Sequence, residues 1–151
     1  HPFGNTMCVI RVTGQQVLDA LEWGARAVPS ENGGFLQVSG LTYEIHTGVA
    51  SSAEKDENGM FTRVSGEYRV KNVMVGGQPL ELDKTYTLAS HNYMLLGHGD
   101  GYTMFDGCEV LGEDMMVDNQ VLITYITTTL GGVVGEQYAN PYGDGRIVAV
   151  E

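Results

Sequence analysis

The residues best suited to chemistry gather in one stretch, where an alternating run that begins at Thr85 meets a glycine-rich segment. Gly97, Gly99 and Gly101 surround a single carboxylate, Asp100. Because glycine adopts positive φ and lets other groups approach its backbone closely, the segment predicts a sharply bent loop. A carboxylate on a loop held by rigid elements is a frequent arrangement in binding sites, and a tight structural turn after a strand is the alternative.

Two aromatic residues stand beside glycine or polar neighbours near probable loops. Phe3 lies in Pro-Phe-Gly-Asn and Tyr93 lies in Asn-Tyr-Met-Leu. Each ring therefore lies where a binding loop could form, and ordinary core packing is the alternative. Together with Asp100 these residues indicate aromatic and polar binding, and taken alone they do not make a catalytic centre.

Known catalytic and metal-binding patterns are not found in the sequence. The spacing of the four histidines matches no zinc site, although His91 and His98 can converge across a strand-to-loop junction. A nucleophile elbow, a phosphate-binding P-loop and a dinucleotide fingerprint are also missing. The run Asp56-Glu-Asn-Gly59 resembles the start of a calcium loop but lacks the later glutamate, so it predicts a solvated hairpin turn.

Composition bounds the class of protein. The chain has 151 residues, 42% hydrophobic and 18% charged, which predicts one globular domain over residues 1–151 with a sizeable core. A net charge of −11 argues against binding nucleic acid or an anionic membrane. No apolar run approaches the 18 residues or so of a membrane span. Whether Cys8 and Cys108 pair is left open, because sequence does not supply disulfide geometry.

The elements that must position these residues are predicted from hydrophobic periodicity. Thr13 and Gln16 form a capping box before a first helix that runs toward Val28, and Asp118 is expected to cap a second helix. The predicted fold class is α+β: one domain of mixed or antiparallel strands with two main helices. Six or seven strands are expected, at 7–12, 35–46, 61–64, 68–75, 80–82, from 85 onward, and at 146–150.

Several local features are predicted between these elements. Gly40 interrupts an alternation and predicts a bulge, and Gly76-Gly77 predicts a two-residue hairpin turn. The segment 107–114 is expected to be a loop. In the second helix a buried face is expected, ended by Gly131-Gly132; its residues are Val121, Leu122, Tyr125, Ile126 and Leu130.

Taken together, several stretches resemble the C-terminal domain of 5′-nucleotidases, the group that includes UDP-sugar hydrolase and animal ecto-5′-nucleotidase. They run in family order over nearly the whole chain, although no single one is diagnostic. The matching stretches are Pro2-Phe-Gly-Asn-Thr6, Gly34-Phe-Leu-Gln-Val-Ser-Gly40, the strand from Lys84, Asn92-Tyr93, and Gly99-Asp-Gly-Tyr-Thr-Met-Phe105.

The resemblance implies that this chain is one of two domains of a longer enzyme, each with a separate role. An N-terminal metallophosphoesterase domain would hold two divalent metal ions, and the C-terminal domain would bind the nucleoside. By resemblance, Phe3 and Tyr93 are the two rings that sandwich the base, and Asp100 holds the ribose hydroxyls; Asn92 and Gly99 belong to the same motifs. This chain itself is expected to contain no catalytic residue, metal ligand or cofactor.

Two departures from the family pattern affect these expectations. The family usually has Phe where Tyr93 stands, and the loop from Asn92 to Asp100 is one residue longer than in better-known members. The family's Asn-Gly-Gly-x-Ile-Arg segment, which normally precedes Pro-Phe-Gly, is missing, so we expect an N-terminally truncated domain that is inactive by itself.

Three hypotheses about function follow. The first is the nucleoside-recognising portion of a metal-dependent 5′-nucleotidase that releases nucleoside and phosphate, with a periplasmic, secreted or cell-surface location. The second is a stand-alone nucleoside-binding module without catalysis. The third is a self-associating fragment, since a missing segment would leave a strand edge exposed.

Overall fold

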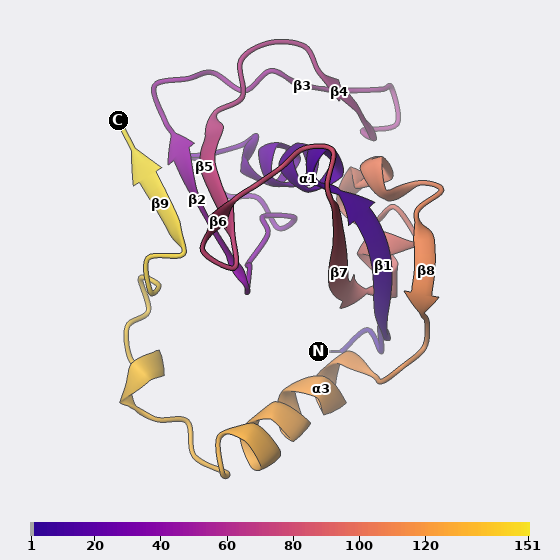
Figure 1. The fold of residues 1–151 in the computed structure, drawn as a ribbon, viewed down its shortest axis with the longest axis vertical. Coiled ribbons are helices and arrows are strands. Elements are labelled where there is room, and N and C mark those ends of the chain that lie inside the picture. Colours follow the sequence, from indigo (N-terminus) through magenta and orange to yellow (C-terminus); the bar gives the residue numbers. More distant parts are fainter. Residues whose placement is uncertain (1) are drawn as a thin grey trace.

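In the computed structural model, which describes residues 2–151, strands and helices form the mixed α+β domain predicted from sequence. Three sheets are present in this range, with strand orders β7-β1-β8, β6-β5-β2-β9 and β3-β4 (Figure 1). The strands are β1 (Met7–Thr13), β2 (Leu41–His46), β3 (Ala53–Lys55), β4 (Phe61–Val64), β5 (Val70–Val75), β6 (Gln78–Pro79), β7 (Thr85–His91), β8 (Glu109–Gly112) and β9 (Ile147–Val150). The α-helices are α1 (Gly14–Ala25), α2 (Asn92–Leu95) and α3 (Asp118–Thr124).

Strand β1 and helix α1 form the centre of the packed part. Alternate β1 residues, Cys8, Ile10 and Val12, are buried, and the strand pairs antiparallel with β7. The predicted capping box is confirmed: the Thr13 hydroxyl accepts the Gln16 N–H at 3.2 Å, and the Gln16 side chain accepts the Thr13 N–H at 2.8 Å. Helix α1 lies between the two larger sheets and buries Trp23 against Phe61.

Two short turns are also confirmed. Gly76 and Gly77 have φ of +57° and +79° and connect β5 to β6, with Val75 paired to Gln78. The turn from Asp56 to Gly59 connects β3 to β4, and the Asp56 carboxylate accepts the N–H groups of Asn58 and Met60. This carboxylate therefore closes a hairpin.

Three strand predictions were wrong in position. Residues 35–40 are not in a strand: β2 begins at Leu41, and its irregularity lies between Thr42 and Glu44 instead of at Gly40. The strand expected at 80–82 is β6 at Gln78–Pro79, because pairing begins directly after the glycine turn. The segment 107–114 was expected to be a loop, but it contains β8, which pairs with β1.

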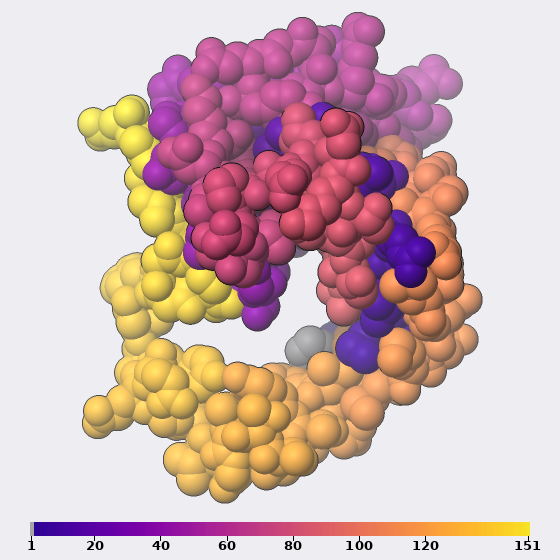
Figure 2. Space-filling view, in the orientation of Figure 1, coloured from indigo at the N-terminus to yellow at the C-terminus, as the bar shows by residue number. Residues whose placement is uncertain are grey.

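The second helix was predicted correctly in position but not in packing. Helix α3 begins at Asp118 with Val117 as its N-cap, so the prediction that Asp118 caps the helix is wrong by one residue. A π-helical turn continues the helix over Tyr125–Thr129. None of its described residues is buried, so the predicted buried face is wrong. The helix belongs to an arm that leaves β8, passes around an opening and returns through β9, which pairs parallel with β2 (Figures 1 and 2).

The two cysteines are not joined. Cys8 is buried in β1, Cys108 is half-buried, and both are free thiols. Among the described residues, no helix is both long enough and apolar enough to cross a membrane.

Candidate functional site

Three distant segments converge on one cavity of about 380 Å³. The segment before β1 contributes Phe3 and Asn5, the loop after α1 contributes Gly33, and the chain after β7 contributes Tyr93 and Asp100. Three of the residues singled out from sequence, Phe3, Tyr93 and Asp100, therefore line the same space. Asn5 and Gly33 were not singled out.

Tyr93 is carried by the short helix α2 and packs on Gly99. The His91 ring caps this helix by accepting the Met94 N–H at 3.2 Å. A Cβ atom at Gly99 would lie 2.2 Å from Tyr93 Cε1, so only glycine leaves room for the ring in this position. Gly99 is buried beneath the ring and does not line the cavity. It supports one wall of the site.

Asn92 connects the two segments that carry the aromatic rings. Its side-chain oxygen accepts the Thr6 N–H at 3.1 Å and the Tyr93 N–H at 2.9 Å, and its own N–H donates to the Thr6 carbonyl at 2.8 Å. Asn92 is half-buried and lies outside the cavity lining. Through these bonds, Asn92 links the segment that carries Phe3 to the helix that carries Tyr93.

Asp100 is presented to solvent by a constrained backbone. Its φ and ψ are 55° and 18°, in the left-handed region, and its carbonyl accepts the indole N–H of buried Trp23 at 2.9 Å. A Cβ at Gly34 would come within 2.9 Å of Asp100 Cβ, so Gly34 admits the side chain. Within residues 2–151 the Asp100 carboxylate has no hydrogen-bond partner, which leaves both oxygens available to a ligand.

A cation lies near this carboxylate. The Arg26 guanidinium is stacked 3.7 Å above the Trp23 ring and donates to the Trp23 carbonyl at 2.6 Å. Burial lowers the pKa of Arg26, while the charges of Tyr102 and Asp100 act in the opposite direction. Arg26 and Asp100 both contact Trp23: the guanidinium packs on the ring face, and the Asp100 carbonyl accepts the indole N–H.

The loop between the ring and the carboxylate is fixed at its centre. His98 also has a left-handed backbone, with φ 55°, and its Nε2 lies 2.6 Å from Asp106 Oδ1. His91 and His98 are thus each engaged locally, one as a helix cap and one with Asp106. Among residues 2–151, no group of three or more His, Cys, Asp or Glu side chains could hold a metal ion.

The arrangement suits a flat ligand that carries hydroxyl groups. Phe3 and Tyr93 expose 85% and 48% of their surface, and both rings line the cavity. One face of Tyr93 packs on Gly99, and no ring contact in the described chain joins Tyr93 to Phe3. A carboxylate and an amide, from Asp100 and Asn5, line the same cavity. Stacking surfaces combined with a few polar groups are typical of small-molecule sites.

Comparison with known proteins identifies the family. The family model described as "5′-nucleotidase, C-terminal domain" matches residues 1–107, which include all five cavity-lining residues. The chain belongs to this family. The resemblance inferred from the motifs is therefore confirmed.

Individual relatives are much longer than this chain. The chain is 32% identical over 149 residues to the trifunctional nucleotide phosphoesterase protein YfkN of Bacillus subtilis, covering 99% of the chain and 9% of that protein. It is 29% identical to the cell wall protein Lmo0130 of Listeria monocytogenes, covering 83% of the chain and 14% of that protein. The crystal structure of a 5′-nucleotidase precursor from Thermus thermophilus superposes with a TM-score of 0.76 at 28% identity, over 99% of the chain and 26% of that structure.

Asn5 and Gly33 were missed for different reasons. Asn5 lies within the Pro-Phe-Gly-Asn motif, so proximity to Phe3 was an available signal. Gly33 precedes the Gly34 stretch but has no side chain to suggest a role. Only the folding of the loop after α1 toward Asp100 brings Gly33 to the cavity, where Asn32 Oδ1 accepts the Gly34 N–H at 3.1 Å.

Proposed function

We propose that this domain binds the nucleoside part of a nucleotide that a longer, metal-dependent 5′-nucleotidase hydrolyses to nucleoside and phosphate. The observation that carries the proposal is the convergence of Phe3, Tyr93 and Asp100 on one cavity from segments about ninety residues apart in sequence. Family membership supports the nucleotide as ligand class.

Each side chain has a definite task in this proposal. The base stacks between the rings of Phe3 and Tyr93, which gives affinity with little selectivity because every base has a π-face. The Asp100 carboxylate accepts hydrogen bonds from the two ribose hydroxyls, and charge-assisted bonds of this kind are about twice as strong as neutral ones. The Asn5 amide can donate to or accept from the edge of the base.

The isolated domain is expected to bind a free nucleoside weakly. Two stacking contacts supply roughly 2–6 kcal/mol, whereas association alone costs an estimated 4–15 kcal/mol. The ribose contact closes this gap only partly, so we expect a dissociation constant in the millimolar range or weaker. The remaining affinity for a nucleotide would come from phosphate contacts outside this chain.

In this proposal, hydrolysis depends on groups outside the described residues. We propose that two divalent metal ions, bound by a metallophosphoesterase domain elsewhere in the longer protein, provide the activated nucleophile and the phosphate ligands. The contribution of this chain is to hold the nucleoside so that the 5′-phosphate extends away from the stacked base. The location proposed for the longer protein is the cell envelope or the exterior, in line with the name of the Listeria relative.

The test is steady-state AMP hydrolysis by the longer gene product with Mn²⁺, Zn²⁺ or Co²⁺. Phe3→Ala and Asp100→Asn should each raise KM for AMP about tenfold or more, because a stacking contact is worth about 1–3 kcal/mol. Tyr142→Ala is the matched control, since this ring is 95% exposed and lies outside the cavity. It should leave KM unchanged.

Two results would contradict the proposal. The absence of AMP hydrolysis with all three metals would exclude the nucleotidase, and unchanged KM in both site variants would exclude the nucleoside role of the cavity. Binding of adenosine by the cavity in a longer protein without hydrolysis would instead support a non-catalytic nucleoside-binding module.

A further inference from the structure

Asp100 lies on a loop whose backbone conformation depends on support from the surrounding structure. Asp100 has φ 55° and ψ 18°, and His98, two residues earlier, has φ 55° as well. Residues other than glycine rarely adopt this left-handed conformation, and they keep it only where neighbouring groups hold the chain. The contacts around Asp100 therefore show which groups hold its carboxylate in place.

The first support is Trp23, near the end of helix α1. This buried side chain donates its indole N–H to the Asp100 carbonyl at 2.9 Å. Gly101 has φ +84°, and a Cβ atom there would lie 2.9 Å from Trp23 Cζ2 and 2.8 Å from the Gly59 carbonyl oxygen. The loop backbone thus packs directly on the indole ring, at a distance that leaves no room for a side chain at Gly101.

The second support is Tyr102, two residues after Asp100. Its buried ring is stacked on Phe105, with ring centroids 6.4 Å apart and an angle of 8° between the planes. Its hydroxyl donates to the Gly34 carbonyl at 2.5 Å. Burial raises the pKa of Tyr102, so the hydroxyl keeps its proton at neutral pH. A Cβ atom at Gly24 would lie 3.0 Å from this hydroxyl oxygen, so glycine in α1 leaves room for it.

Gly34 connects the Tyr102 hydroxyl with the Asp100 side chain. A Cβ atom at Gly34 would come within 2.9 Å of Asp100 Cβ. The Gly34 N–H donates to Asn32 Oδ1 at 3.1 Å, and Asn32 Nδ2 donates to the Gly24 carbonyl at 3.1 Å. Asp100 therefore packs against a segment that is held by Asn32 on one side and by Tyr102 on the other.

These supports restrain the carboxylate of Asp100 without using its oxygens. Trp23 bonds to the backbone of Asp100, and Tyr102 bonds to the segment against which the Asp100 side chain packs. Two neighbouring hydroxyls of a sugar can each donate to a carboxylate oxygen. Such a pair of bonds forms at less cost when the carboxylate is already held in one orientation.

On the basis of the nucleoside-binding function proposed above, we propose that Tyr102 and Trp23 are positioning residues that orient the Asp100 carboxylate toward the 2′- and 3′-hydroxyls of a ribose. The site then favours ribonucleotides over 2′-deoxyribonucleotides. Neither Tyr102 nor Trp23 lines the cavity, so this preference depends on two side chains that act only through Asp100.

The orientation of the carboxylate determines how much the 2′-hydroxyl contributes. When Asp100 is held in place, a 2′-deoxyribose removes one hydrogen bond to a charged group, a loss of about tenfold or more in binding. When the loop relaxes, the carboxylate can turn toward water, and the 2′-hydroxyl contributes less. Loss of either donor should therefore weaken the preference for ribose and leave the stacking of the base intact.

The test is steady-state hydrolysis of AMP and 2′-deoxy-AMP by the longer gene product with Mn²⁺. The wild type should favour AMP by about tenfold or more in kcat/KM. Tyr102→Phe removes only the hydroxyl, and Trp23→Phe removes the indole N–H while keeping an aromatic ring. Each should reduce the ratio to about threefold or less. If Trp23→Phe does not fold, Tyr102→Phe alone decides the question.

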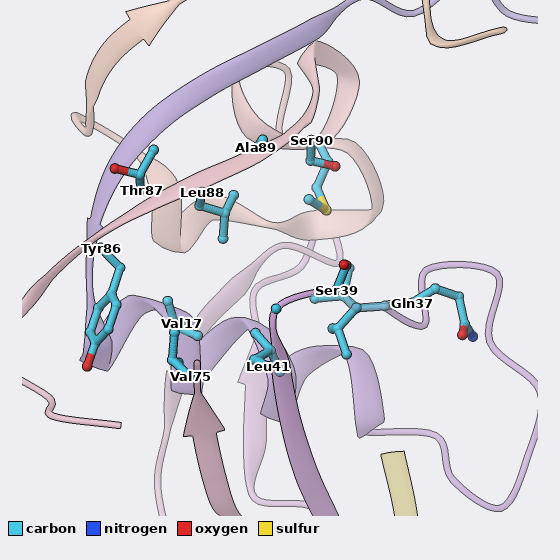
Figure 3. Close-up of a pocket in the computed structure, with 14 residues that line it drawn as sticks. Val17, Gln37, Ser39, Leu41, Val75, Tyr86, Thr87, Leu88, Ala89 and Ser90 are labelled. Atoms are coloured by element: carbon cyan, nitrogen blue, oxygen red, sulfur yellow. The ribbon is translucent and has the colours of Figure 1, made fainter. Parts of the chain in front are cut away.

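Two variants control for general effects on packing. Tyr68→Phe also removes a hydroxyl, which donates to Asp19 at 2.6 Å and lies outside the nucleoside cavity. Leu41→Ala enlarges a separate cavity of about 340 Å³ between β2 and β7, which none of the residues that hold Asp100 lines (Figure 3). Both variants should lower the free energy of unfolding and leave the ratio of kcat/KM values unchanged.

A second readout needs no ligand. In the 151-residue chain the Gly101 N–H donates to the His98 carbonyl at 2.9 Å, inside the loop that carries Asp100. Hydrogen exchange of this amide should be about fivefold or more faster in Tyr102→Phe and Trp23→Phe, because each variant releases one attachment of the loop. The two packing controls should leave it unchanged. Unchanged exchange in both donor variants would overturn the positioning role, whether or not the longer protein hydrolyses AMP.

The kinetic outcomes separate the positioning role from the function on which it rests. Equal kcat/KM for both substrates in the wild type, or a ratio that Asp100→Asn leaves unchanged, would contradict ribose recognition by Asp100 and the positioning role with it. A ratio that Asp100→Asn abolishes but Tyr102→Phe and Trp23→Phe retain would overturn the positioning role alone. An equal fall in Tyr68→Phe or Leu41→Ala would assign the effect to a general loss of packing.

Discussion

The packed part of the molecule and its C-terminal arm follow the same sequence rules with different results. Every buried hydrophobic residue of the described chain lies between Cys8 and Phe105, and no residue from 106 to 151 is buried. Helix α1 begins where predicted, α3 begins within one residue of its predicted start, and both carry apolar residues at helical spacing. Helix α1 buries its face between two sheets, whereas α3 borders an opening.

The difference shows what a periodic pattern specifies. Apolar spacing determines that a segment is an amphipathic helix, but the partner of its apolar face is supplied by the rest of the chain. The family model ends at residue 107, close to the point where burial ends. The candidate site lies in the packed part, where Trp23 holds the backbone of Asp100.

The largest contrast is expected from truncating one side chain in each part. Trp23→Ala should lower the free energy of unfolding by about 3–5 kcal/mol, because it empties a fully buried position and removes the bond to Asp100. Ile123→Ala in the arm should change it by about 0.5 kcal/mol or less. Urea denaturation followed by circular dichroism measures both. Equal losses would show that the arm is packed as tightly as the core.

A smaller effect is expected from adding one methyl group beneath Tyr93. Gly99→Ala should destabilise the domain by about 1–3 kcal/mol and displace the ring, because the new Cβ would overlap Cε1. Gly48→Ala is the control, since no atom lies within 4 Å of its Cβ position. Thermal unfolding and adenosine binding are the measurements. A Gly99→Ala variant with normal stability and normal binding would disprove the supporting role of this glycine.

The smallest change in stability is expected from Glu22, a buried carboxylate in the packed part of the molecule. Burial raises the pKa of this group above its ordinary 4.5, while the N–H groups of Val70 and Arg69 and the Arg69 charge offset part of the rise. A carboxyl with a raised pKa stabilises the fold fully below about 4.5, and this contribution is lost as pH rises through the folded value.

Glu22→Gln removes this dependence while keeping an oxygen for the Val70 N–H, which Glu22 accepts at 2.9 Å. The stability of the variant relative to wild type should therefore rise as pH increases above about 4.5. Asp83→Asn, at an exposed position, is the control. Denaturation at a series of pH values provides the curve. A difference between Glu22→Gln and wild type that is constant with pH would contradict the raised pKa.

Sequence alone predicted the local features that depend on neighbouring residues. The capping box at Thr13, the turn at Gly76-Gly77 and strands β1, β4 and β7 are of this kind. Strand β8 was missed because its ladder with β1 joins residues about a hundred positions apart, a pairing that its own short sequence does not signal. For the same reason, the sequence of α3 does not show whether its apolar face is buried.

The candidate site shows the same limit. The residue types and motif order indicated Phe3, Tyr93 and Asp100, and the structure brings them to one cavity. The sequence did not show which residues line the cavity and which support it. Asn92 and Gly99 lie outside the cavity and support its walls, whereas Asn5 and Gly33 line it. That distinction depends on three-dimensional contacts between segments.

The most direct test of the central claim is a two-dimensional NMR titration of the domain with adenosine up to about 10 mM. The account predicts saturable shifts for the amides of Phe3, Tyr93 and Asp100, with a dissociation constant in the millimolar range, and no shifts along α3. Shifts confined to the arm, or no shifts at all, would contradict the assignment of this cavity to a nucleoside.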